Sequence, residues 1–324
     1  MLNKKLSLLS CLLFGILFCI VPVMASAAFP EKAVTMIIPF DAGGASDIVG
    51  RKLAQVAEKY LGQTIIIVNR PGGSGATGYA ETMQAKPDGY TVCAALSTIV
   101  IHKVMGTLPQ GHDAFDIIGA YNFDPGAMAV NVERPWKDLK SFIEYAKANP
   151  NKVTVGTSAA GGIWNVGTVA IESATGARFN IIASGGGVAK PAREAAGGHI
   201  DAVCGSPNEL LAHVESGKLR LLAVTSEERL PAFPDVPTFK ELGYDVVITG
   251  TRAVIAPKGL PEPAFKALKE AFRKAANDPE YQKFLKDIGS GSLYLDDAAV
   301  RKLWDNQTTM FSTILNQAKQ MHGK

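Results

Sequence analysis

Short apolar runs alternate with longer amphipathic stretches along most of the chain. Residues 34–38 form the first run and are rich in β-branched side chains, which predicts a buried strand. A glycine-containing loop follows, and a helical pattern of apolar residues begins at Asp47. The runs at 64–68 and 90–96 predict two further strands. This order of strand, loop, helix and strand is typical of a mainly parallel α/β sheet covered by helices.

The same pattern starts again in the middle of the chain. A helix is predicted over 137–148, and the proline-rich residues 229–237 predict an exposed crossing segment. Further strands are predicted at 127–132, 153–156, 180–182, 202–204, 219–225 and 254–257. The C-terminal part is predicted to be helical over 262–276, 279–288 and 297–320. Two sets of strands, each with its own helices, indicate two α/β lobes.

Residues 1–28 have the order of a cleaved secretory signal. Lys4 and Lys5 precede an almost wholly apolar run at 6–24, and Ala25-Ser26-Ala27 places small residues at its end. An uncleaved membrane anchor is the alternative, but the small residues favour cleavage. We therefore expect a periplasmic protein.

The positions of the cysteines favour a free protein over a lipid-anchored one. Cys11 and Cys19 lie within the signal, and neither stands at the end of the apolar run. Cys93 and Cys204 lie in apolar, strand-like contexts far apart in the sequence. An oxidising compartment permits a disulfide, but we expect two free, buried thiols.

Charge and composition narrow the range of partners. The formal net charge is +3, and it falls to +1 when the two lysines of the signal are removed. Such a balance does not indicate nucleic acid as a partner. No cofactor or metal is predicted, because the five histidines are scattered and no Cys/His cluster has zinc spacing.

Two glycine loops carry the candidate chemistry. Each follows a predicted strand and precedes a helical pattern, at Gly43-Gly44 and at 156–162. Such a loop presents unpaired backbone N–H groups and the positive end of a helix dipole. Ser46 is a candidate N-cap or hydroxyl donor, and Asp47 can accept hydrogen bonds from loop amides. A plain strand-to-helix connection is the alternative for either loop alone, but two loops facing across a cleft would hold one carboxylate.

The spacing of the loops excludes two common nucleotide motifs. The first loop lacks both the Gly-x-Gly-x-x-Gly dinucleotide fingerprint and the Gly-Lys-Ser/Thr of a phosphate loop. A third glycine run, Ser184-Gly185-Gly186-Gly187, precedes a helix predicted at 189–196.

The motif Pro39-Phe40-x-x-Gly43-Gly44-x-x-Asp47 resembles the opening motif of the tripartite tricarboxylate transporter solute receptors, the Bug/TctC family. Further segments similar to that family follow in order at 69–72, 87–90, 197–201, 217–220, 222–226, 234–238 and 256–257. The resemblance spans essentially the whole chain after the signal.

The resemblance implies a two-lobed periplasmic binding fold, type II-like, with two chain crossings and a mixed, mainly parallel sheet in each lobe. The first lobe would comprise 29–126 and 251–324, and the second 127–250. It further implies a receptor without enzyme activity that binds a small carboxylate by lobe closure. The partners would be the large and small membrane subunits of a secondary transporter, and we expect the receptor to be a monomer.

The family's ligand-binding residues can be placed on this sequence by its motifs. The resemblance implies that the first loop binds through Phe40, Gly43, Gly44, Ala45, Ser46 and Asp47. It implies that the second loop binds through Ser158, Ala159, Ala160, Gly161 and Asn165. Asn165 stands where the family often has histidine, which keeps a donor but removes a titratable group.

Three departures from the family pattern predict a roomier far end of the pocket. The third loop reads Ser184-Gly185-Gly186-Gly187-Val188 where relatives commonly have Pro-Tyr-Lys-Gly-Gly, and Gly205 replaces a frequent aspartate. Thr251-Arg252 replaces a common aromatic pair.

We hypothesise that Arg252 or Trp164 contacts the far end of the ligand, by pairing with a second carboxylate or by stacking on a ring. The alternatives are a solvated hinge residue for Arg252 and core packing for Trp164.

Two other functions stay open on the sequence. An exported hydrolase would use Ser46 or Ser158 as nucleophile, but there is no Gly-x-Ser-x-Gly elbow and no histidine beside a comparable loop. A receptor that presents its ligand to a membrane signalling protein would use the same closed form. Citrate-like, aliphatic dicarboxylate, aromatic carboxylate and amino-acid ligands all fit the expected clasp.

Overall fold

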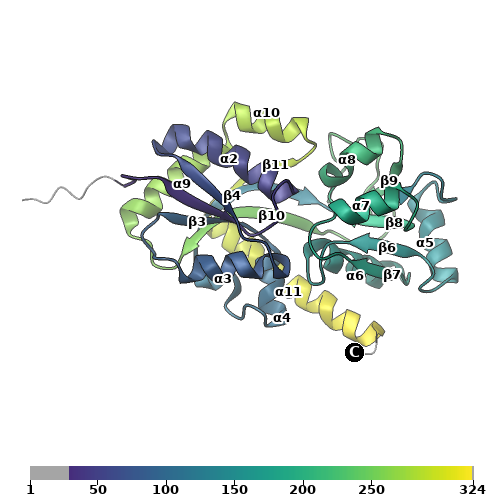
Figure 1. Ribbon diagram of the computed structural model, residues 1–324. Coiled ribbons are helices and arrows are strands. Elements are labelled where there is room, and N and C mark those ends of the chain that lie inside the picture. Colours follow the sequence, from purple (N-terminus) through teal and green to yellow (C-terminus); the bar gives the residue numbers. More distant parts are fainter. Residues whose placement is uncertain (1–28, 323–324) are drawn as a thin grey trace, which may run out of the picture.

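The computed structural model describes residues 29–322, so the predicted signal lies outside the described residues. Two separate sheets lie side by side, and each is covered by helices on both faces (Figure 1). The prediction of two mixed α/β lobes is confirmed.

The first sheet has the strand order β11-β4-β10-β3-β1-β2. Its strands are β1 (Val34–Ile38), β2 (Ile65–Asn69), β3 (Thr91–Leu96), β4 (Phe115–Pro125), β10 (Thr249–Pro257) and β11 (Gly291–Leu295). One face packs against α2 (Ala45–Leu61), α9 (Glu262–Ala276) and α10 (Pro279–Asp287). The other packs against α3 (Ala76–Gln84), α4 (Thr98–Met105) and α11 (Asp297–His322).

The second sheet has the strand order β7-β6-β8-β5-β9. Its strands are β5 (Ala127–Asn131), β6 (Thr154–Thr157), β7 (Asn180–Ala183), β8 (Ala202–Gly205) and β9 (Leu219–Val224). Helices α7 (Ala189–Ala196) and α8 (Pro207–Glu215) cover one face, and α5 (Leu139–Ala148) and α6 (Ile163–Thr175) cover the other (Figure 1). Two short 3₁₀ helices, η1 (Gly73–Gly75) and η2 (Gly111–Ala114), lie in the first lobe.

The chain passes between the sheets after β4 and again before β10, and one buried threonine joins the two passages. Thr225 Oγ1 donates to the Ile248 carbonyl at 2.6 Å and accepts from the Gly126 N–H at 2.8 Å. Thr225 is 1% exposed. Its hydroxyl therefore stabilises the backbone of both connections at the hinge.

Helix α11 adds a third link between the lobes. It packs against α4 and β4 of the first lobe and against α6 of the second. Ser173 on α6 donates to Gln317 on α11 at 2.7 Å. The apolar core cluster that contains Trp304 and Phe311 of α11 also contains Ile171 of α6.

Several local expectations need correction. Antiparallel pairs slightly outnumber parallel ones, because β4 and β10 run antiparallel to each other and β5 runs antiparallel to both neighbours. Strand β4 was not predicted, because its sequence includes glycine, asparagine and aspartate and its pairing with β10 has register shifts. The segment at 229–237 is mostly exposed as predicted, but it packs on the second sheet through Leu230, Phe233 and Val236 rather than crossing there.

The two cysteines of the described chain are free and buried, as predicted. Burial raises the pKa of Cys93 to about 12 and that of Cys204 to about 11. No helix among residues 29–322 is long and apolar enough to span a membrane. The same residues contain no cluster of three or more histidine, cysteine or acidic side chains arranged to hold a metal.

Candidate ligand-binding cleft

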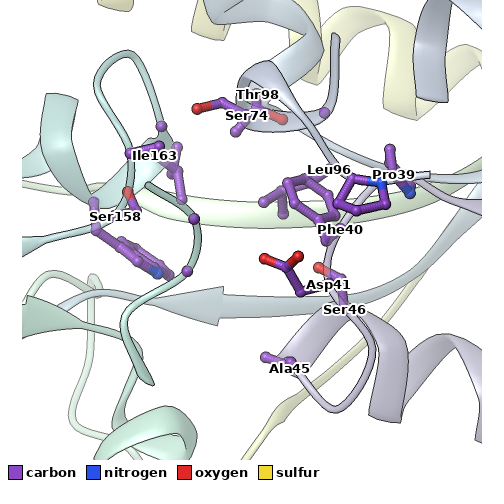
Figure 2. Close-up of a pocket in the computed structure, with 18 of the residues that line it drawn as sticks. Pro39, Phe40, Asp41, Ala45, Ser46, Ser74, Leu96, Thr98, Ser158 and Ile163 are labelled. Carbon is purple, nitrogen blue, oxygen red and sulfur yellow. The ribbon is translucent and has the colours of Figure 1, made fainter. Parts of the chain in front are cut away.

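A cavity of about 360 Å³ opens between the two lobes (Figure 2). Loops at the carboxyl ends of strands from both sheets form its walls. The first lobe contributes Pro39, Phe40, Asp41, Gly44, Ala45, Ser46, residues 71–75, Leu96, Thr98 and Arg252. The second contributes Ser158, Ala159, Gly162, Ile163, Trp164, Gly185, Gly186, Gly187 and Glu209. This position is the usual one for ligands of open α/β sheets.

The first glycine loop leaves the start of helix α2 open toward the cavity. Gly44 is the N-cap, and no side chain caps the helix. Gly43 adopts a φ of 77°, which favours glycine, and its N–H donates to Asp47 Oδ2 at 2.9 Å. Gly43 itself is not among the residues that line the cavity.

Asp47 is buried behind the loop rather than in the cavity wall. It accepts hydrogen bonds from Arg51 Nε at 2.9 Å and from Asn69 Nδ2 at 2.8 Å, in addition to the Gly43 N–H. Burial alone would raise the pKa of Asp47, but these hydrogen bonds outweigh it and lower the pKa. Asp47 therefore holds the loop in shape, in agreement with the expectation that it bonds loop amides.

The second glycine loop has the same construction. Gly162 is the N-cap of α6, and again no side chain caps the helix. Asn165 Oδ1 accepts from the Gly161 N–H at 3.2 Å, and the Asn165 N–H donates to Ser158 Oγ at 3.3 Å. A Cβ on Gly162 would lie 2.8 Å from the Ala159 carbonyl oxygen, so only glycine fits there. Asn165, Ala160 and Gly161 support this loop without lining the cavity.

The third loop closes the cavity from the second lobe. The Ser184 hydroxyl lies 2.8 Å from the carbonyl oxygens of Gly186 and Gly187, and it braces the loop from outside the lining. The Ala159 N–H donates to the Gly186 carbonyl at 2.8 Å, which joins the second and third loops. Gly185 lines the cavity, whereas Gly205 does not, since its α-carbon faces Val188.

Arg252 lines the cavity but is not a solvated hinge residue, because only 3% of it is exposed. Its guanidinium forms a buried ion pair with Asp124 and donates to Asn122. Its Nε donates to Ser46 Oγ at 3.1 Å, so Ser46 supports Arg252 and is not the N-cap of α2. Burial opposes the charged guanidinium, but Asp124 raises the pKa of Arg252 above its ordinary value.

Trp164 lines the cavity and also belongs to the apolar core cluster. Its Nε1 donates to Glu209 Oε2 at 2.9 Å. Glu209 and Ser206 form a capping box at the start of α8, with the Ser206 hydroxyl 2.6 Å from Glu209 Oε2. Burial raises the pKa of Glu209 despite these hydrogen bonds. Whether Trp164 stacks on a ligand ring stays a prediction.

The two lobes touch at the mouth of the cavity. Ser74 Oγ of the first lobe donates to the Ala160 carbonyl of the second at 3.3 Å. Residues 71–75, which include Ser74, line the cavity, although they were not expected to do so. Only Pro71 and Gly72 of this loop belong to a segment that resembles the receptor family.

Asp41 and Glu209 also line the cavity and were not predicted. The sequence pattern Ser206-x-x-Glu209 was a readable capping-box signal for one of them. Asp41 had no such signal, because it is a single acidic residue inside a loop.

Two lobes joined by two chain connections, with loops from both lining one cavity between them, define the periplasmic binding protein fold. The family model of the tripartite tricarboxylate transporter family receptor, TctC, matches residues 49–319. The chain therefore belongs to this family of transporter receptors.

Relatives agree with this assignment. A Cupriavidus necator protein, described as the UPF0065 protein in the gbd 5' region, is 32% identical over 280 residues, which cover 85% of this chain and 84% of that protein. The crystal structure of a TctC solute binding protein from Polaromonas is 32% identical, with a TM-score of 0.73 over 90% of this chain and all of that one. MatC from Rhodopseudomonas palustris with bound malate, at 23% identity, shares the fold with a TM-score of 0.80 over 88% of this chain and 99% of that one.

Membership of this family shows that the protein is a binding protein and not an enzyme, so the hydrolase alternative is wrong. Ser46 Oγ accepts from Arg252, Ser158 Oγ accepts from a backbone N–H, and no histidine is among the residues lining the cavity.

Proposed function

We propose that the protein captures a small carboxylate in this cavity, outside the cytoplasmic membrane, and delivers it to the large and small membrane subunits of a tripartite transporter. It acts as a monomer that closes around the ligand, with no cofactor. The family supports the receptor role, and the residues that line the cavity support the class of ligand.

The observation that carries this proposal is the pair of open helix starts. Helices α2 and α6 begin at glycine N-caps on opposite walls of one cavity, and neither has a side-chain cap. Among the described residues, the backbone N–H groups of Ala45, Ser46 and Ile163 have no hydrogen-bond acceptor. Unsatisfied N–H groups and the positive end of the helix dipole favour an anion at such a position. A carboxylate between the two starts would satisfy both.

Ligand contacts to both lobes would stabilise the closed form that the membrane subunits recognise. The contact between Ser74 and Ala160 supports this view, because it can form only when the lobes approach each other. Small-angle scattering should show a smaller radius of gyration on ligand binding. An unchanged radius with a tightly bound ligand would count against closure.

The ligand class can be tested without knowing the ligand. Native mass spectrometry of protein purified from its host, or from cells grown in rich medium, should reveal a bound small acid. Malate is a sensible first purified ligand, because a relative of the same fold has it bound.

Two variants at the start of α2, one charged and one uncharged, test whether a carboxylate binds there. Ala45 lines the cavity at the start of α2, as Figure 2 shows. Ala45→Asp places a negative charge there, which suits the helix but repels a ligand carboxylate. We expect Ala45→Asp to weaken carboxylate binding at least tenfold (about 1.4 kcal/mol) more than the uncharged Ala45→Asn. Equal binding by both variants would overturn the carboxylate clasp.

The order of residues in the N-terminal segment supports export with removal of 1–28. The intact mass of the protein from its host tests this directly, since retention of the segment would refute it. Uptake by vesicles containing the two membrane subunits tests delivery. Binding to a membrane sensor without any stimulation of uptake would favour the signalling alternative.

A further inference from the structure

The charges around the cavity are not arranged for a ligand with two carboxylates. Two acidic side chains, Asp41 and Glu209, line it, and Arg252 is the one cationic side chain among the lining residues. Arg252 is not a free cation, because Asp124 is its buried ion-pair partner. Asn122 and Ser46 accept further hydrogen bonds from N–H groups of the same guanidinium.

Asp41 lies in the first glycine loop, three residues before Gly44. Its carboxylate points into the cavity between the two lobes (Figure 2). Among residues 29–322, no side chain or backbone N–H forms a hydrogen bond or an ion pair with this carboxylate. The carboxylate of Asp47, and not that of Asp41, accepts the hydrogen bond from the Gly43 N–H in this loop.

The opposite wall packs close to Asp41 without supplying a partner for its carboxylate. Residues 185–187 are all glycine, and a Cβ on Gly186 would lie 2.8 Å from Asp41 Oδ2. No side chain of this loop can therefore neutralise Asp41. Glu209 lies on the same lobe as this loop and is half-buried.

A ligand bound in the cavity would displace water from Asp41. A carboxylate that loses water without gaining a cation is destabilised, and a second carboxylate nearby adds repulsion. A ligand ammonium group removes both costs, because it forms charge-assisted hydrogen bonds with the carboxylate. The lining thus favours a positive group close to the ligand carboxylate.

We propose that Asp41 determines specificity by binding an ammonium group, and that the ligand is a zwitterionic, amino-acid-like carboxylate rather than a di- or tricarboxylate. This inference rests on the proposed function, since the clasp still holds the ligand's carboxylate. Glu209 adds negative potential to the same cavity.

Matched acids test the inference by isothermal titration calorimetry. On a four-carbon skeleton the probes are 2-aminobutyrate, 4-aminobutyrate, butyrate and succinate. A six-carbon set and a benzoate set, each with an amino acid, a monoacid and a diacid, cover larger ligands. We expect the tightest ligand to be an amino acid, which binds about 10- to 100-fold more tightly than the matched monoacid and diacid.

Variants of Asp41 should move this preference. Asp41 is exposed and makes no contact that the fold requires, so its variants are expected to fold. Asp41→Asn should remove most of the preference for the amino acid, and Asp41→Lys should reverse it in favour of the diacid. Asp235→Asn, at an exposed aspartate outside the cavity, is the matched control and should change nothing.

The outcomes separate the inference from the proposed function. Tighter binding of a diacid than of its matched amino acid would overturn the inference and leave carboxylate capture intact. The same would follow if Asp41→Asn kept the full preference for the amino acid. Binding of none of these acids would overturn carboxylate capture itself, and the inference with it.

Discussion

Breaking the buried pair between Arg252 and Asp124 is expected to destabilise the protein more than breaking any surface ion pair of similar geometry. Arg252 is 3% exposed and Asp124 is 2% exposed. In Arg252→Met, Asp124 keeps its negative charge in a buried position, and Asn122 and Ser46 lose a donor. Removal of one partner of a buried pair costs about 3–5 kcal/mol.

The thermal midpoint should fall accordingly. For a chain of this size, each kcal/mol corresponds to roughly 2 °C, so Arg252→Met should melt roughly 6–10 °C below the wild type. Differential scanning calorimetry of the ligand-free protein measures this. The double variant Arg252→Met/Asp124→Leu should recover part of the loss, because it leaves no uncompensated charge.

An exposed pair supplies the control for this measurement. Arg229 bonds Glu241 through two nitrogens on the surface of the second lobe, at 2.7 Å for the shortest contact. Solvent screens such a pair, so Arg229→Met should shift the midpoint little. If Arg252→Met and Arg229→Met lower the midpoint equally, the argument from the uncompensated buried charge is wrong.

Three further predictions follow from contacts described above. Thr225→Val removes the hydroxyl that bonds the Ile248 carbonyl and the Gly126 N–H, and leaves only their longer direct hydrogen bond of 3.3 Å at the hinge. This change should lower the free energy of unfolding by about 0.5–1.5 kcal/mol in chemical denaturation, and a loss below the error of the measurement would contradict the hinge role. Cys93 and Cys204 should not react with a thiol reagent in the native state, because burial raises their pKa values to about 12 and about 11. Both should react in denaturant, and rapid labelling of the native protein would disprove this prediction. Because burial raises the pKa of Glu209, its protonated carboxyl stabilises the folded state below pH 4.5, and this stabilisation is lost as pH rises through the folded-state pKa. Thermal midpoints should therefore fall more steeply with rising pH for the wild type than for Glu209→Gln, and parallel curves of midpoint against pH would refute this.

The sequence was sufficient for the features that depend on local structure. The glycine loops at Gly43-Gly44 and Gly162 were predicted because strand, glycine and helix follow one another directly, and both loops begin helices that face the cavity. Helix α9 was predicted with the observed bounds, because its apolar residues recur at helical spacing over 262–276.

What the sequence could not supply depends on contacts between distant residues. Nothing near Arg252 in the sequence indicates Asp124, since the two meet only because β10 pairs with β4. The same holds for Ser46, which looked like a helix cap but accepts from Arg252 across 206 residues of chain. Asp41 was overlooked because one acid in a loop has no pattern, and only the cavity shows where it points.

The position of β10 determines when the first lobe can form during synthesis. Strand β10 lies between β3 and β4, and β11 lies on the far side of β4, so every partner of β4 comes from residues after 248. The second sheet, in contrast, uses strands from one continuous stretch, 127–224. A nascent chain can therefore complete the second sheet while the first remains divided. The first sheet stays incomplete until β11, at Gly291–Leu295, has been made, which is about nine-tenths of the way along the chain.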